Sequence, residues 1–266
     1  MFYEAGTEKS GTPLFLLHGG GLDSARLSYG SILPILGEKF HVIAPDLPGY
    51  GGTDKPDVPY TMEWYQEFLD GFIQTLGYDE INLGGLSLGG GIALGYSLKH
   101  PQKVKKLVLI APYGLSNKIP YSRLTHWLLK HPRMYDGFNR LMLSNRTFLK
   151  ASLKMLFLNS DALTDELVAE IMEAARQKDN SLAWKAFQLS KVINQKLKTC
   201  YLNQLHQLSM PVLLLTGKKD SLVPSRDVER ASRLIPRSKL VELEECGHWI
   251  PRDKSSEFLR ALENFF

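Results

Sequence analysis

The sequence predicts an α/β fold, with a mostly parallel central sheet flanked by helices and a helical segment inserted between its two halves. Short apolar runs bounded by turn residues are typical of strands that are buried on both faces. These runs alternate with stretches of helical periodicity, and such alternation places crossover helices over a parallel sheet. The alternation stops between about residues 115 and 208, where no strand pattern is seen.

The first part of the sheet is expected within residues 1–114. Its strands are predicted from apolar runs at 13–17, 41–45, 81–86 and 106–111. Helices are predicted from apolar residues at helical spacing at 28–36, 61–76 and 88–100. The pattern resumes in 209–266, with strands predicted at 211–216 and 239–243 and helices at 225–234 and 254–265. We therefore expect residues 1–114 and 209–266 to form one core domain.

The intervening segment, 115–208, is predicted to be a helical cap subdomain that packs on the sheet. Five helices are expected in it, at 122–130, 135–143, 147–158, 164–178 and 181–198, with Thr164 as an N-terminal cap. The segment carries 14 Lys or Arg and 7 Asp or Glu. This excess could attract an anionic group or a membrane surface, but solvated helix faces explain it as well.

Composition excludes several classes of protein. With 266 residues, 44% hydrophobic and 23% charged, the chain is an ordinary globular sequence and can bury a full core. A net charge of +4 is too small to indicate nucleic-acid binding. No apolar run approaches 18 residues and the N-terminus has no signal-peptide pattern, so we expect a soluble cytoplasmic protein with no integral membrane segment. Its oligomeric state stays open.

Only two cysteines are present, Cys200 and Cys246, and their spacing gives neither a disulfide framework nor a metal or redox motif. Both are interpreted as small buried apolar residues. No metal and no organic cofactor is predicted.

The most informative segment is Gly85–Gly89, a GxSxG pattern set directly between a predicted strand and a predicted helix. A serine at such a turn takes a strained backbone conformation, and flanking glycines permit close approach of the helix to the strand. Ser87 is therefore the predicted nucleophile. The alternative is an ordinary glycine-rich loop.

A serine hydroxyl needs a base, and the base needs an acid to orient it. His248 follows the last predicted strand and Asp220 follows the strand before it, so both reach the same edge of the sheet. The chain order Ser87, Asp220, His248 is typical of this triad type. Asp46 also follows a strand, but it precedes the serine in a glycine-rich turn and is interpreted as structural.

Three consecutive glycines, Gly19–Gly21, follow His18 at the end of the first predicted strand. Bare backbone N–H groups in such a loop can converge on a developing oxyanion. Gly20 and Leu88, the latter at the start of the helix after Ser87, are the predicted oxyanion-hole donors. His18 is expected to support the loop.

With these segments in view, the chain resembles a serine hydrolase of the α/β-hydrolase fold superfamily. The resemblance rests on the motifs HGGG, DLPGYGGTDKP, GLSLGG, GKKDSLVP and CGHWIPRDKSSEF, which span nearly all of the predicted sheet domain. It implies an α/β-hydrolase fold of about eight strands, a helical cap inserted after strand six, and catalysis through an acyl-enzyme. The short N-terminus fits the loss of a first strand common in relatives.

The substrate is less well defined than the triad. The serine disfavours dehalogenase and epoxide-hydrolase relatives, which carry an aspartate there, and Leu88 departs from the tryptophan typical of proline iminopeptidases. Carbon–carbon hydrolases of the meta-cleavage type are the serious alternative, but they commonly have asparagine and arginine where this chain has Leu86 and Ile171. Arg176, five residues further on, faces another direction.

We therefore expect cleavage of carboxylic esters with small to medium apolar acyl groups, a small-molecule substrate class. Carbon–carbon cleavage of meta-cleavage-type keto-acids is the alternative, and a non-catalytic small-molecule binder on the same fold is the second. Apolar cap residues could line an acyl pocket, although most should hold the cap helices together. These residues are Leu124, Trp127, Leu128, Phe138, Leu141, Met142, Phe148, Leu149, Met155, Leu156 and Phe157.

Overall fold

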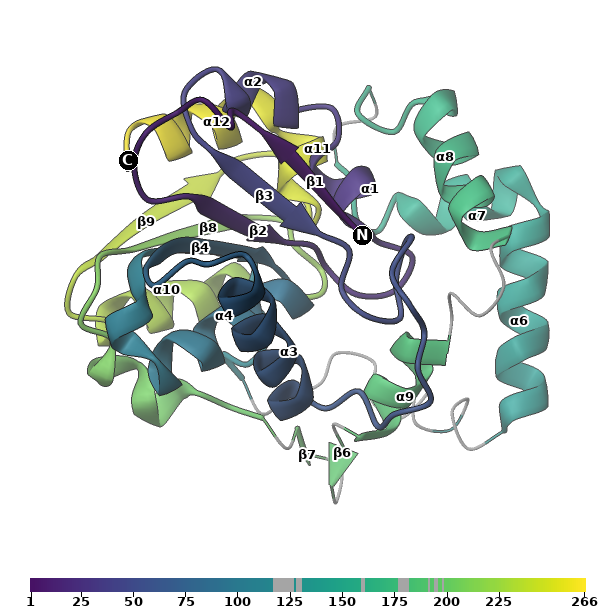
Figure 1. Cartoon of the computed structure of the whole chain (residues 1–266). Coiled ribbons are helices and arrows are strands. Elements are labelled where there is room, and N and C mark those ends of the chain that lie inside the picture. Colours follow the sequence, from purple (N-terminus) through teal and green to yellow (C-terminus); the bar gives the residue numbers. More distant parts are fainter. Residues whose placement is uncertain are drawn as a thin grey trace.

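A seven-stranded sheet forms the centre of the computed structural model, which describes residues 1–116, 127, 131–158, 161–176, 182–190, 192–193, 196–197 and 199–266 (Figure 1). The strand order is β1-β3-β2-β4-β5-β8-β9. The strands are β1 (Phe2–Ala5), β2 (Leu14–Leu17), β3 (Val42–Pro45), β4 (Ile81–Leu86), β5 (Val104–Ile110), β8 (Val212–Gly217) and β9 (Ser238–Leu243). Within this sheet only β1 runs antiparallel to its neighbour.

The predicted sheet is confirmed, with one strand that the sequence analysis did not include. β1 pairs with β3 at the edge of the sheet, and its side chains are alternately exposed and half-buried. It therefore lacks the continuous apolar run by which the other strands were identified. Because the sheet has seven strands instead of about eight, the insert follows the fifth strand of this chain.

Helices cover both faces of the sheet (Figure 1). One face carries α3 (Met62–Thr75), α4 (Leu88–Lys99) and α10 (Ser225–Leu234); the other carries α1 (Ala25–Tyr29), α2 (Leu33–Gly37), α11 (Ile250–Asp253) and α12 (Ser255–Glu263). The central strands supply both cores by alternation: Phe15 and Leu17 pack on the first face, and Leu14 and Leu16 on the second. The strands β2, β3, β4 and β8 are buried at every position, so each of them supplies side chains to both cores.

The helix predicted at 28–36 is wrong in one respect, because it is two short helices. Gly30 is the C-cap of α1, and Pro34 lies in the first turn of α2, where its missing N–H has no helical partner to lose. The chain turns between the two helices.

The insert contains α6 (Pro132–Ser144), α7 (Arg146–Leu153), α8 (Asp165–Arg176) and α9 (Leu182–Ser190). The side chain of Thr164 caps α8, since its hydroxyl accepts a 3.1 Å hydrogen bond from Leu167 N–H, as predicted. The helix predicted at 181–198 ends at Ser190, and β6 (Val192–Ile193) pairs antiparallel with β7 (Lys196–Leu197). The absence of strands predicted for the insert is therefore wrong.

The predicted helix at 122–130 lies outside the described residues, apart from residue 127. Two 3-10 helices complete the described structure, η1 (Pro101–Lys103) and η2 (Leu202–Gln207). In the described parts of the chain, no helix combines the length and apolar character needed to cross a membrane.

Candidate active site

Ser87 stands at a sharp turn between β4 and α4. Its φ of 52° and ψ of −111° lie outside the conformations that residues other than glycine usually adopt. Backbone bonds hold the turn: Ser87 N–H donates to the Ile110 carbonyl at 2.9 Å, and Tyr113 N–H donates to the Ser87 carbonyl at 2.9 Å. The strain is thus maintained by the chain that leaves the neighbouring strand, β5.

The glycines on either side of Ser87 are required by space. A Cβ on Gly85 would lie 2.3 Å from the Gly89 carbonyl carbon, and a Cβ on Gly89 would lie 2.4 Å from the His18 oxygen. Gly89 N–H also donates to that oxygen at 3.1 Å. The two outer glycines of the GxSxG pattern therefore allow the start of α4 to contact the ends of β4 and β2.

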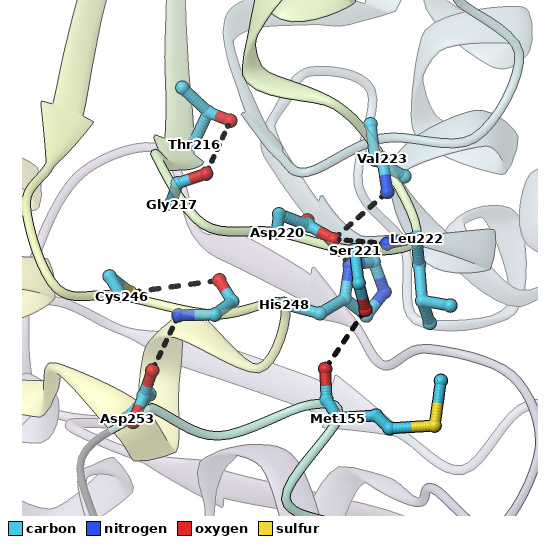
Figure 2. A network of polar contacts seen from close by, with 11 residues as sticks. Met155, Thr216, Gly217, Asp220, Ser221, Leu222, Val223, Cys246, His248 and Asp253 are labelled. Atoms are coloured by element: carbon cyan, nitrogen blue, oxygen red, sulfur yellow. Dashed lines mark hydrogen bonds and ion pairs between the residues drawn. The ribbon is translucent and has the colours of Figure 1, made fainter.

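His248 and Asp220 are hydrogen-bonded to each other. The distance from His248 Nδ1 to Asp220 Oδ2 is 2.7 Å, and both residues are buried. The other carboxylate oxygen, Oδ1, accepts from Leu222 N–H at 2.7 Å and Val223 N–H at 2.9 Å. These bonds fix the carboxylate, which in turn orients the imidazole so that Nε2 is turned away from the acid (Figure 2).

The insert contacts the loops of Asp220 and His248 through its main chain, and Figure 2 shows the contact between Met155 and Ser221. The Leu156 carbonyl accepts from His248 N–H at 2.9 Å, and Ser221 Oγ donates to the Met155 carbonyl at 3.0 Å. Leu158 N–H donates to the Asp253 carboxylate, which also accepts from Gly247 N–H. We call residues 155–158 the strap, because they join the loops after β8 and β9 to the end of α11.

The glycine loop after β2 is held by two buried side chains. His18 Nε2 accepts from Leu47 N–H at 2.9 Å, so the proton sits on Nδ1, which lies 2.7 Å from the Gly19 carbonyl. Gly19 N–H donates to Asp23 at 2.6 Å. This bond occupies the Gly19 amide. The next amide along the loop, that of Gly20, is therefore the candidate donor to an oxyanion. His18 supports the loop, in line with the expectation from the sequence.

Asp23 is a site residue that sequence reasoning missed. Its carboxylate is buried and accepts bonds from Gly19 N–H, Ser24 N–H and Ser28 Oγ. Burial raises the pKa of this carboxyl, although His18 and these hydrogen bonds act in the opposite direction. Trp249 Nε1 donates to Ser28 Oγ at 2.8 Å, so a buried chain of bonds runs from the glycine loop to the residue after His248. A lone Asp in a loop gave no pattern to detect.

Trp184 of α9 was also missed. A Cβ on Gly20 would lie 2.2 Å from Trp184 Cζ3, so the indole packs directly against the glycine loop. In the same helix Phe187 meets Tyr113, with ring centroids 5.6 Å apart. Because the loops after β2 and β5 flank the one that carries Ser87, α9 lies beside the candidate site. From the sequence this segment is predicted only as a cap helix.

The five predicted residues of the site lie at one edge of the sheet. Gly20 follows β2, Ser87 and Leu88 follow β4, Asp220 follows β8 and His248 follows β9, all at the carboxyl ends of parallel strands. The Cβ position of Gly19 is 3.6 Å from Ser87 Cβ, so the glycine loop and the serine are neighbours.

Other predicted positions fall as follows. Asp46 accepts backbone bonds from Ala25 at 2.9 Å and Gly52 at 2.8 Å. Cys246 is buried, but Cys200 is half-buried, so the interpretation that both are buried is wrong for Cys200, which follows the insert's hairpin. Leu86 and Ile171 are both buried in the apolar core of the sheet face that carries α1.

Comparison with known proteins agrees with this architecture. The chain is 26% identical over 258 residues to 2-hydroxymuconate semialdehyde hydrolase of Pseudomonas putida, covering 96% of this chain and 87% of that protein. It is 27% identical over 268 residues to a 2-hydroxy-6-oxo-2,4-heptadienoate hydrolase from a strain of the same species, covering 96% and 89%.

Solved structures with the same fold include hydrolases of both kinds considered from the sequence. The meta-cleavage product hydrolase of Pseudomonas fluorescens IP01 superposes with a TM-score of 0.82 at 22% identity, covering 100% of this chain and 93% of that one. A thermophilic esterase of Thermogutta terrifontis gives 0.78 at 25% identity, covering 99% and 91%. The family model described as alpha/beta hydrolase fold matches residues 12–254. The chain belongs to the α/β hydrolase fold family, and it is a hydrolase.

Proposed function

We propose that the protein is a serine hydrolase in which Ser87 is the nucleophile, His248 the general base and Asp220 the acid that orients the base. The observation that carries the proposal is the 2.7 Å bond from His248 Nδ1 to Asp220, at the sheet edge where Ser87 holds its strained turn. With Nδ1 bonded to the acid, Nε2 is the nitrogen left to take the serine proton. Ser87 Oγ then attacks a carbonyl carbon.

The oxyanion that forms is stabilised by the N–H groups of Gly20 and Leu88. Leu88 begins α4, and the first amides of a helix have no partner within the helix. The amides beside these two are engaged elsewhere: Gly19 N–H by Asp23 and Gly89 N–H by the His18 carbonyl. The helix dipole adds to the stabilisation of negative charge at Ser87.

For the bond that is cleaved, the relatives favour carbon–carbon hydrolysis of a conjugated keto-acid over the ester hydrolysis expected from the sequence. The two relatives reported above are named as hydrolases of 2-hydroxymuconate semialdehyde and 2-hydroxy-6-oxo-2,4-heptadienoate, compounds that contain no ester, and each match covers nearly the whole chain. In this reaction the bond between the carbonyl carbon and its carbon neighbour breaks, and the electron pair leaves with the conjugated fragment. That fragment takes the proton held by His248, and water then hydrolyses the acyl-enzyme with His248 again acting as base.

Ester hydrolysis is the second candidate, and a specific observation favours it. Leu86 and Ile171, which stand where carbon–carbon hydrolases commonly have asparagine and arginine, are 2% and 0% exposed and pack in the apolar core. Neither can hold a carboxylate. An ester needs no such group, because it carries no carboxylate; its leaving alcohol takes the proton and the acyl part stays on Ser87.

The test is turnover by the wild type and Ser87→Ala of two substrate sets. One set is a 2-hydroxy-6-oxo-dienoate followed by its absorbance, and the other is p-nitrophenyl esters of increasing acyl length. A fluorophosphonate label detected by intact mass reports on Ser87 independently of substrate. We expect stoichiometric labelling and dienoate turnover, both lost in Ser87→Ala.

Two other outcomes would assign the protein a different function. Labelling with turnover of esters alone establishes the second candidate. A protein that binds the ligands, takes no label and turns over nothing is a binder, and the proposed function is then wrong.

A further inference from the structure

Gln188 carries a buried acceptor that has no hydrogen-bond partner among the residues that the structure describes. Its side-chain oxygen Oε1 is shielded from solvent, and the residue is 8% exposed. A buried amide oxygen without a partner is costly, and native proteins rarely keep one unless a ligand or water completes it. The position of Gln188 in the fold suggests which ligand does so.

Gln188 shares a face of α9 with Trp184, an aromatic residue beside the candidate site. It comes one turn after Trp184 and directly after Phe187, and residues three and four apart lie on one side of a helix. Trp184 packs on Gly20, and Phe187 meets Tyr113, which follows β5. The two aromatic rings are themselves nearly parallel, with centroids 5.7 Å apart and an interplanar angle of 25°.

The helix is fixed in this position by a close backbone approach. A Cβ on Gly49 would lie 2.2 Å from the Ala183 Cβ, and Ala183 is fully buried. Figure 1 shows α9 beside the loop between β3 and α3, and Gly49 belongs to this loop. The face of α9 that bears Trp184 and Gln188 is therefore held in a fixed position against the loops on either side of Ser87.

We propose that this face recognises the substrate: the partly buried ring of Trp184, supported from behind by the core residue Phe187, contacts its flat apolar part, and the amide oxygen of Gln188 accepts a hydrogen bond from a substrate hydroxyl. The substrate class is thus an apolar or conjugated acyl compound that bears a hydroxyl group. This inference rests on the proposed function, since it takes Ser87 as the point of attack.

The experiment measures binding apart from chemistry. In the Ser87→Ala background, calorimetry compares ligand pairs that differ in one hydroxyl: a 2-hydroxy-6-oxo-dienoate with its deoxy analogue, and ethyl 3-hydroxybutyrate with ethyl butyrate. The added variant is Gln188→Met, which keeps the length of the side chain and removes the acceptor. Leu189→Met, at an exposed position in the same helix, is the matched control.

We expect at least one hydroxylated ligand to bind about tenfold more tightly than its deoxy partner, a preference that Gln188→Met abolishes and Leu189→Met retains. We also expect Gln188→Met to raise Tm, because an apolar group replaces an unpaired oxygen. The inference would be overturned if Gln188→Met lost the same affinity for both members of each pair, if the parent protein preferred neither hydroxylated ligand, or if Gln188→Met had a lower Tm. Failure of the proposed function is separate, since it shows as unchanged turnover in Ser87→Ala.

Discussion

The indole Nε1 of Trp249 donates a 2.8 Å hydrogen bond to Ser28 Oγ, although the two residues are 221 positions apart. Ser28 passes this connection to Asp23, whose carboxylate holds the Gly19 amide. The loop proposed to stabilise the oxyanion and the loop that carries His248 are thereby parts of one buried hydrogen-bonded unit.

Ser28→Ala should lower the free energy of unfolding by about 1–3 kcal/mol, because the buried indole N–H and the Asp23 carboxylate lose the hydroxyl that they share. Urea denaturation measures the effect. Ser97→Ala is the matched control, since its hydroxyl is equally buried but bonds only to the Ala93 carbonyl of its own helix. If both variants lose the same stability, Ser28 does not link the two loops.

Asp23 should make stability depend on pH. Burial raises the pKa of its carboxyl, so the folded protein holds the proton more tightly than the unfolded chain. The contribution to stability is therefore fully present below the usual aspartate pKa of about 4 and is lost as pH rises through the raised value.

The difference in unfolding free energy between wild type and Asp23→Asn should accordingly fall as pH rises from about 4. Urea denaturation of both proteins at successive pH values gives this difference. Asp57→Asn, at an exposed position, supplies the background. A difference that does not vary with pH would show that the folded state leaves the proton affinity of Asp23 unchanged.

Gly20→Ala should reduce turnover by about a hundredfold, because the new methyl group would lie 2.2 Å from Trp184 Cζ3 and must displace either the loop or the indole. The double variant with Trp184→Ala should recover part of the loss by making room. A double-mutant cycle on kcat/KM measures the coupling. Additive effects of the two changes would mean that the indole does not limit the position of the loop.

Ser87→Gly should be more stable than Ser87→Ala by about 1 kcal/mol, since the φ of 52° at Ser87 strains any residue that has a Cβ. Both variants lack the hydroxyl, so the comparison isolates the backbone. Thermal and chemical denaturation of the two proteins provide the measurement. Equal stabilities would indicate that the turn relaxes without cost.

Gly247→Ala should lower both stability and kcat, because a Cβ there would lie 2.4 Å from the Leu156 carbonyl oxygen and force the strap away from His248. Gly71→Ala is the control: it lies within α3 with open space around it, and should gain about 0.5–1 kcal/mol. Denaturation and steady-state kinetics test both variants. Unchanged kcat in Gly247→Ala would separate the strap from the chemistry.

The parts of the fold that could be predicted are those whose signal is local. β4 and β8, which lead to Ser87 and Asp220, are buried at every position, β9 keeps a shorter apolar run before His248, and the glycines around Ser87 mark its turn. β1 could not be found this way, because an edge strand with one half-buried side gives only weak alternation. The hairpin of β6 and β7 was missed because short apolar runs do not distinguish strand from helix.

The site was predictable only where residue type and position in the chain are enough. Asp23 and Trp184 act through contacts with residues distant in sequence, and nothing near either of them indicates a role. The strap is less predictable still, since Met155 and Leu156 contribute carbonyl oxygens, which every residue possesses. Main-chain contacts between distant segments follow from the folded geometry and leave no mark in residue identity.

The strap also bears on how such a protein can change over evolution or in the laboratory. Leu156 offers one carbonyl to the amides of both His248 and Trp249, so a portion of the insert belongs to the scaffold of the proposed acid–base pair. Grafting a relative's insert at its outer junctions would transplant that scaffold as well. A chimaera that exchanges the helices but retains this chain's residues 155–158 is the recombination that leaves the histidine loop supported.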